Sequence, residues 1–120
     1  MVDLILWRHA EARDAKAGES DLERPLTARG QKQAQRVAEW LNRHLASSTR
    51  ILVSPALRTR QTADALGRKY RVVEALAPGS NVNQLLTAVR WPASQPVLVI
   101  GHQPALGQTA AYLMEGALAK

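Results

Sequence analysis

Arg8 and His9 directly follow the apolar run Leu4-Ile5-Leu6-Trp7, near the start of a chain of 120 residues. A short apolar run that ends in a basic pair is typical of a buried strand whose carboxyl end opens onto a site, which is where open α/β sheets bind ligands. A neutral imidazole at this position can act as a nucleophile or a base near pH 7. The arginine beside it offers a planar set of donors that suits phosphate or carboxylate groups.

Two other predicted strands end in similar chemistry. The run Arg50–Val53 is followed within a few residues by Arg58, and the run Val97–Ile100 is followed almost at once by His102. If these strands are parallel neighbours, two arginines and two histidines converge on one edge of a sheet. Cations gathered in this way repel one another, and a multiply charged anion such as a phosphoryl group is their natural occupant. The candidate site residues are therefore Arg8, His9, Arg58 and His102.

Predicted strands and helices alternate along the chain. The expected strands are Val2–Trp7, Arg50–Val53, Tyr70–Val73 and Val97–Ile100. The expected helices run from Thr27 to Ser47, from Ala56 to Arg68, from Asn81 to Arg90 and from Ala105 to Met114. This alternation favours right-handed crossovers and a mostly parallel sheet. We expect residues 1–120 to form a single α/β domain, with helices on both faces of the sheet.

The segments next to the candidate residues are expected to be structural. Ser54 and Pro55 form a common helix start, with serine as the N-cap and proline as the first helical residue. Ser54 is interpreted as a cap rather than a nucleophile, because no Asp–His pair is evident near it. The polar segment between Ala10 and Glu23 is predicted to be a short loop, too small to close over the site as a lid.

Composition narrows the class of protein. Hydrophobic residues make up 46% of the chain, which supports a packed core, and cysteine is absent, which excludes disulfides and cysteine-based zinc sites. No apolar stretch approaches the roughly 20 residues of a membrane span, so we expect a cytoplasmic protein that does not bind a membrane. The net charge of +6 favours anionic partners, but the cations are spread along the chain, so nucleic acid is not expected as a partner.

Four short motifs, in this order, resemble those of the histidine phosphatase (phosphoglycerate mutase-like) superfamily. They are Arg8-His9, Pro25-Leu26-Thr27-x-x-Gly30-x-x-Gln33-Ala34, Ser54-Pro55-x-x-Arg58-x-x-Gln61-Thr62 and Gly101-His102. The short chain, the Arg-His-Ala sequence in place of Arg-His-Gly, and the sequence Gly-His-Gln-Pro are similar to the SixA-type phosphohistidine phosphatase branch. The superfamily usually continues past the last helix with another strand, so the resemblance implies a sheet that can lack its C-terminal strand.

The resemblance also implies a role for each candidate residue. His9 would take the phosphoryl group onto a ring nitrogen, and water would then hydrolyse the phosphohistidine. Arg8, Arg58 and a protonated His102 would bind the phosphoryl oxygens, so that neither a metal nor another cofactor is required. The implied partner is a protein that carries phosphohistidine, and the chain is expected to be a monomer.

Many members of the superfamily carry an acidic general acid after the third strand. Glu74 is the nearest candidate here, but its surroundings do not match that pattern. A phosphoramidate needs less help from an acid, because an imidazole leaving group can depart already protonated. Three alternatives stay open: a phosphomonoesterase or mutase of the same superfamily that acts on a small molecule, a phosphate-binding module without catalysis, and a nucleic-acid binder that rests on charge alone.

Overall fold

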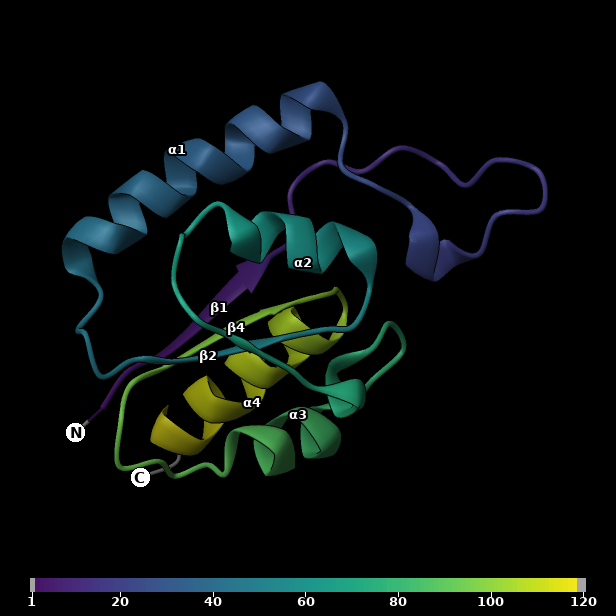
Figure 1. The fold of residues 1–120 in the computed structure, drawn as a ribbon. Helices are drawn as coiled ribbons and strands as arrows, with labels where there is room; N and C mark the ends of the chain where they lie inside the picture. The colour runs from purple at the N-terminus through teal and green to yellow at the C-terminus, as the bar shows by residue number, and fades with distance from the viewer. Residues whose placement is uncertain (1, 119–120) are drawn as a thin grey trace.

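The computed structural model describes residues 2–118, which form an α/β domain around a four-stranded sheet (Figure 1). The strands are β1 (Leu4–Arg8), β2 (Arg50–Val53), β3 (Arg71–Val72) and β4 (Val97–Gly101). Their order in the sheet is β1-β4-β2-β3, and every pairing is parallel. The prediction of a mostly parallel sheet is confirmed.

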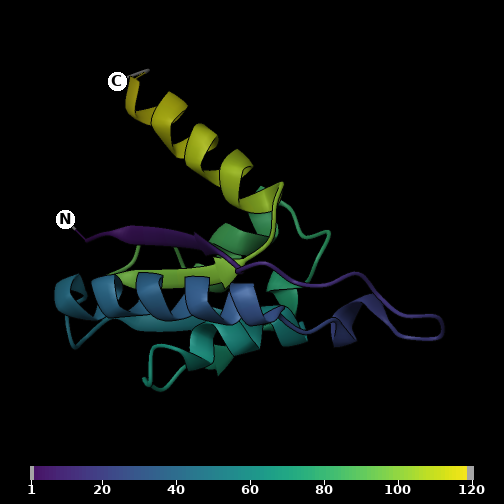
Figure 2. The same ribbon diagram turned by 90° about the horizontal axis from the view of Figure 1, so that it is seen from above.

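Helices cover both faces of this sheet, as expected. They are α1 (Ala28–His44), α2 (Leu57–Asp64), α3 (Val82–Val89) and α4 (Ala105–Leu118), with short 3-10 turns η1 (Asp21–Glu23) and η2 (Glu74–Leu76). The two views show α1 and α2 on one face and α3 and α4 on the other (Figures 1 and 2). Within residues 2–118 no strand follows α4, and β1 forms one edge of the sheet.

The two core clusters are built from alternate residues of the central strands. Leu98 and Ile100 of β4 pack in the cluster that includes residues of α1 and α2. Val97 and Val99 pack in the cluster that includes residues of α3 and α4. Successive side chains of a strand point to opposite faces, so one buried strand supports both layers. This two-sided packing fixes β4 in the sheet and holds its carboxyl end beside those of β1 and β2.

The start of α1 packs closely against the segment that follows β1. Thr27 caps the helix as predicted, since its hydroxyl accepts a hydrogen bond from the backbone N–H of Gly30 at 2.9 Å. The N–H of Thr27 donates to the carbonyl oxygen of Glu11 at 3.0 Å. A Cβ atom on Gly30 would collide with that same carbonyl. Gly30 is therefore required for the close approach, although a glycine in a first helical turn weakens the helix itself.

The predicted cap of α2 is wrong, and the helix starts one residue later than predicted. The backbone stays extended through Ala56, which occupies the N-cap position without a side-chain hydrogen bond, and the helix begins at Leu57. Ser54 and Pro55 therefore lie before the helix, and Ser54 makes a different contact, described below. The helix also ends at Asp64, before the predicted Arg68.

No helix in the described part of the chain is both long enough and apolar enough to cross a bilayer.

Candidate functional site

Three neighbouring strands bring the candidate residues to one edge of the sheet. Arg8 lies opposite Gly101 in the register of β1 and β4. The N–H of His9 donates to the carbonyl oxygen of Gly101 at 3.2 Å, and the N–H of Ser54 donates to that of Ile100 at 3.1 Å. The parallel ladder therefore continues just past the strand ends, where it sets the backbone of His9 beside that of Gly101 and His102.

The ring of His9 is held by a local hydrogen bond. Its Nδ1 lies 2.7 Å from the carbonyl oxygen of Ala10, which can only accept, so Nδ1 carries the proton. The N–H of Ala10 in turn donates to the hydroxyl of Thr62 in α2 at 3.1 Å. Nε2 of His9 is left with its lone pair, which is the form that a nucleophilic imidazole requires.

The surroundings of His9 keep its ring neutral. Burial lowers the pKa of His9 below its ordinary value of 6.5, and the charges of Arg58, Arg8 and Arg24 lower it further, against a smaller opposing effect of the Ala10 hydrogen bond. A lowered pKa means that Nε2 is unprotonated at neutral pH. Burial and the arginine charges therefore favour the neutral ring, and the hydrogen bond to Ala10 selects the tautomer whose lone pair is on Nε2.

His102 lies next to His9, with their ring centroids 5.3 Å apart. Nε2 of His102 is 2.7 Å from the hydroxyl oxygen of Ser54, and both side chains are buried. Burial, followed by the charge of Arg58, lowers the pKa of His102 from 6.5 to about 4. In the protein without a bound anion the ring of His102 is therefore neutral at pH 7, and its protonation beside a phosphoryl group stays a prediction.

Arg58 is almost fully buried, with its side chain 6% exposed. One terminal nitrogen of its guanidinium donates to the carbonyl oxygen of Asp21 at 2.8 Å, and the other donates to the Asp21 carboxylate at 3.0 Å. Its Nε is buried and has no hydrogen-bond partner among the described residues. A buried donor without a partner is uncommon and costs free energy unless a ligand or water accepts from it. Arg58 thus has one donor that no described residue satisfies, beside the two that bind Asp21.

The loop after β1 contributes two charged residues that sequence reasoning did not place in the site. Asp21, in η1, pairs with Arg24 at 3.0 Å as well as with Arg58. Nε of Arg24 also donates to the carbonyl oxygen of Arg13 at 2.7 Å. The pairing of Asp21 with Arg24 could have been anticipated, since residues three apart in a helical turn lie on one side. No local pattern signals the contact between Asp21 and Arg58, which are 37 residues apart.

A surface cavity of about 360 Å³ opens beside His9. Its lining residues are Arg8, His9, Ala10, Glu11, Ala12, Arg24 and Gln33. Arg58 and His102 are buried and do not line this cavity. Both are nevertheless close to His9, since the charge of Arg58 lowers the pKa of His9 and the ring of His102 lies beside that of His9. The structure therefore gathers all four candidate residues, with Arg8 and His9 on the accessible side.

Glu74 does not join this group in the described structure. It begins η2 after the edge strand β3, its side chain is exposed, and it makes no side-chain hydrogen bond or ion pair within residues 2–118. The same residues contain no group of three His, Asp or Glu side chains arranged to hold a metal ion. The positive charge near His9 comes from arginine side chains.

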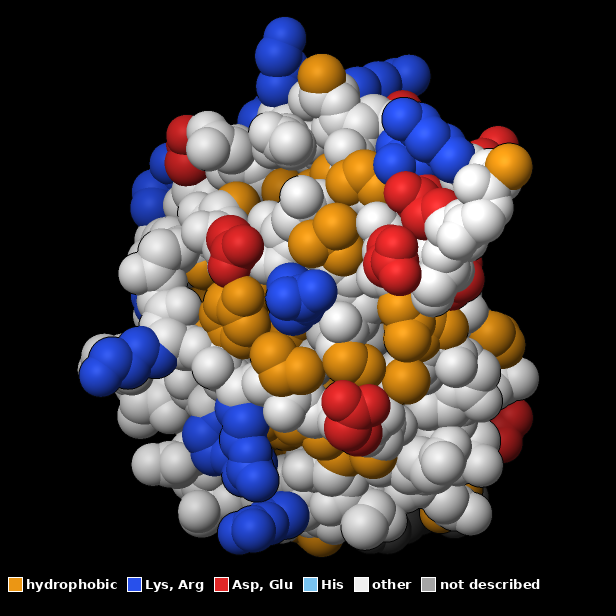
Figure 3. All heavy atoms as spheres, turned by 45° about the vertical axis from the view of Figure 1, so that its right-hand side comes forward, with side chains coloured by type: hydrophobic (Ala, Val, Ile, Leu, Met, Phe, Trp, Pro, Cys, Tyr) orange, Lys and Arg blue, Asp and Glu red, His pale blue; other side chains and the backbone are white. Residues whose placement is uncertain are grey.

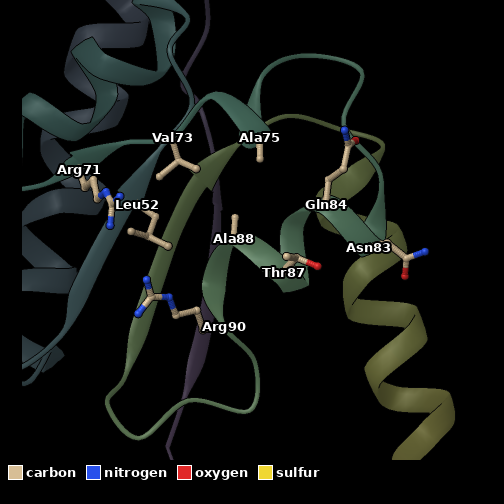
Figure 4. Close-up of a pocket in the computed structure, with 9 residues that line it drawn as sticks. All are labelled: Leu52, Arg71, Val73, Ala75, Asn83, Gln84, Thr87, Ala88 and Arg90. Atoms are coloured by element: carbon tan, nitrogen blue, oxygen red, sulfur yellow. The ribbon is translucent and has the colours of Figure 1, made fainter.

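A second cavity, of about 480 Å³, lies between α3 and the strands β2 and β3 (Figure 4). Its lining is Leu52, Arg71, Val73, Ala75, Asn83, Gln84, Thr87, Ala88 and Arg90. Two arginines at one end are its charged groups, and neither a histidine nor a carboxylate lines it. On the face shown in Figure 3, basic, acidic and apolar side chains are interspersed, a distribution that does not favour nucleic acid on that face.

Sequence comparison finds relatives along most of the chain. Residues 4–77 match the model of the histidine phosphatase superfamily (branch 1). Phosphohistidine phosphatase SixA of Escherichia coli is 32% identical over 124 residues, which cover 96% of this chain and 76% of that protein. An uncharacterized protein of a Picosynechococcus species is 35% identical over 117 residues, which cover 91% of this chain and 71% of the relative.

Solved structures of similar fold agree with this result. A structure of the protein histidine phosphatase SixA complexed with tungstate is 30% identical, with a TM-score of 0.76, over 90% of this chain and 74% of that one. A candidate phosphohistidine phosphatase SixA from Nakamurella multipartitia is 36% identical, with a TM-score of 0.77, over 88% of this chain. The chain spans 62% of the length of the Nakamurella protein.

Proposed function

The chain belongs to the histidine phosphatase superfamily (branch 1), and we propose that it hydrolyses phosphohistidine on a protein substrate, through a phosphohistidine intermediate on His9. The observation that carries the proposal is the state of His9. Its Nδ1 is bound to the carbonyl of Ala10 at 2.7 Å, and its Nε2 has no hydrogen-bond partner among the described residues and lies near three arginines and the ring of His102. The similarity to SixA proteins supports phosphohistidine as the substrate.

In the first step, Nε2 of His9 attacks the phosphorus of the substrate in line with the bond that breaks. The P–N bond of the substrate phosphohistidine breaks as the new P–Nε2 bond forms, and the substrate imidazole leaves. This leaving group can depart with a proton already on its ring, which agrees with the absence of a placed acid among the described residues. In the second step, water attacks the same phosphorus, the P–Nε2 bond breaks, and phosphate is released.

The arginines supply the charge that this reaction needs. Phosphoryl transfer depends mainly on positioning and on stabilising charge on the oxygens, and charge-assisted hydrogen bonds from guanidinium groups do both. Nε of Arg58 is a buried donor that a phosphoryl oxygen can satisfy. The exposed Arg8 can reach the oxygens from the cavity side. A bound phosphoryl dianion would also raise the pKa of His102, since a nearby opposite charge favours the imidazolium.

Phosphate release from a phosphohistidine-bearing protein tests the proposal. We expect the wild-type chain to release phosphate and His9→Ala to be inactive. His44→Ala is the matched control, because His44 is an exposed histidine at the end of α1 and should leave the rate unchanged. Equal rates for wild type and His9→Ala would refute the assignment of His9.

Two further measurements separate the alternatives. In the first, labelled phosphate is trapped on the protein in an acid-labile form. Its presence on the wild type and its absence from His9→Ala would support the intermediate. Tight binding of tungstate without turnover would indicate a phosphate-binding module instead. Assays with aryl phosphates and phosphosugars beside the phosphohistidine protein compare the substrate classes. A higher kcat/KM for a small phosphate ester than for the phosphohistidine protein would identify a small molecule as the substrate.

A further inference from the structure

The carboxylate of Asp21 bridges two arginines at the candidate site. One oxygen accepts from Arg24 at 3.0 Å, and the other accepts from Arg58 at 3.0 Å. The hydrogen bond from Arg24 is the main cause that holds the pKa of the Asp21 carboxyl below its usual range, so the group is ionised at neutral pH. A negative charge of the protein itself therefore occupies donors of two cations that surround His9.

The two ends of this bridge are anchored very differently. Arg58 is buried in α2, whereas the side chain of Asp21 is 55% exposed and η1 contains no buried residue. The loop is fixed by other contacts on either side of η1. Arg13 makes an ion pair with Glu19 at 2.7 Å, and the N–H of Leu26 donates to the side chain of Gln61 at 2.7 Å. The loop can therefore keep its path when the Asp21 carboxylate moves or loses its charge.

The arginines do not depend on this carboxylate for their orientation. Arg58 also donates to the backbone carbonyl of Asp21 at 2.8 Å, a bond that any residue at position 21 can provide. Arg24 donates through Nε to the carbonyl oxygen of Arg13 at 2.7 Å. The distinctive contribution of the Asp21 side chain is thus its charge, which repels an incoming anion and occupies donors that an anion would use.

We propose that Asp21 is a built-in competitor of the substrate: its carboxylate occupies donors of Arg58 and Arg24 until a phosphoryl group displaces it. The carboxylate lowers the affinity of the site for every phosphoryl anion, so that only a ligand with further contacts outside the cavity overcomes it. The inference rests on the proposed function in one respect, that a phosphoryl group binds at Arg58.

Calorimetric titration with inorganic phosphate tests this competition directly. We expect Asp21→Asn, which keeps the size of the side chain, to bind phosphate about fivefold more tightly than wild type, the order of effect of one unit charge at a partly exposed site. Asp21→Ala should show the same direction. Glu23→Gln is the matched control, since Glu23 is an exposed acid of the same 3-10 turn and its removal should change the affinity less than twofold.

Two results of the phosphate titration would contradict the competition between Asp21 and the phosphoryl group. If both Asp21 variants bind phosphate more weakly than wild type, or within twofold of it, the carboxylate orients the arginines or is irrelevant, and the inference is overturned. Equal gains for Asp21→Asn and Glu23→Gln would also overturn it, because the effect would be one of net charge alone. If the expected pattern appears while the wild type releases no phosphate from a phosphohistidine protein, the proposed function fails and the competition stands.

Discussion

The hydroxyl oxygen of Ser54 lies 2.7 Å from Nε2 of His102, and it joins the carboxyl ends of β2 and β4. The same oxygen accepts a hydrogen bond from the N–H of Ala56 at 3.3 Å, so the hydroxyl hydrogen is free to be donated to the ring. Ser54 therefore occupies one nitrogen of His102 and leaves Nδ1 for other contacts. A buried imidazole with one nitrogen held in this way has a fixed orientation next to His9.

Replacement of Ser54 by alanine should lower the stability of the protein. Ser54→Ala leaves Nε2 of His102 buried without a partner, and such a loss costs about 1–3 kcal/mol in the free energy of unfolding. Urea denaturation followed by circular dichroism measures the change. Ser48→Ala is the control, because Ser48 is exposed in a turn and makes no side-chain hydrogen bond within residues 2–118. A Ser54→Ala effect no larger than that of Ser48→Ala contradicts the prediction.

The lowered pKa of His102 should make stability depend on pH. Above pH 6.5 the ring is neutral in both the folded and the unfolded chain. As the pH falls toward 4, the unfolded chain takes up a proton that the folded protein does not bind, because the pKa of His102 is about 4 in the fold. The free energy of unfolding should therefore fall by about 1.5 kcal/mol between pH 6.5 and pH 5. His9, whose pKa is also lowered, adds to the fall in the same direction.

Denaturation curves at several pH values in this window test the assignment. The variant His102→Gln removes the titrating group, so its stability should change less between pH 6.5 and pH 5 than that of the wild type. His44→Gln, which removes an exposed histidine from the end of α1, should keep the wild-type slope. Parallel slopes for wild type and His102→Gln would show that another group is responsible.

The main elements of the fold follow from patterns that the chain itself carries. The continuous β-branched and aliphatic run at Val97 to Ile100 favours a strand buried on both faces, and in the structure it lies inside the sheet beside β2. Basic residues come within two positions of the ends of such runs, so parallel pairing of neighbouring strands predicts that Arg8, His9 and His102 meet. Arg58 is expected to join them because the helix that carries it begins shortly after the end of β2.

The missed features depend on contacts between distant segments. Ser54 has the residue type and the neighbouring proline of a helix cap, but its hydroxyl bonds to a histidine that is 48 residues away, and the helix starts later. Asp21 lies in a polar loop with no periodic pattern, and only the path of that loop over α2 brings it to Arg58. The pKa of His102 depends on its burial, which no residue type reveals.

Arg58 should not be replaceable by lysine. A lysine carries the charge but has neither the planar set of donors nor Nε, which is the donor of Arg58 without a partner in the described protein. We expect Arg58→Lys to lower kcat/KM by about 100-fold, the order seen when one donor to a developing oxyanion is lost. Arg60→Lys is the control, because Arg60 lies two residues after Arg58 in α2 and is partly exposed. This variant should retain activity. Comparable losses for both variants would point to damage to α2 rather than to phosphoryl binding.

Gly30 should be intolerant of any side chain, although it lies in the first turn of a helix. A methyl group there meets the carbonyl of Glu11, two residues after His9, so either the helix or the segment that holds His9 must move. We expect Gly30→Ala to destabilise the protein by about 1–3 kcal/mol and to reduce phosphatase activity as well. Gly116→Ala in α4, where an added Cβ meets nothing within 4 Å, is the matched substitution and should be neutral or slightly stabilising. A Gly30→Ala protein with wild-type stability would show that α1 can move away from the Glu11 carbonyl at little cost. Wild-type activity in a destabilised Gly30→Ala protein would show instead that His9 does not depend on this packing.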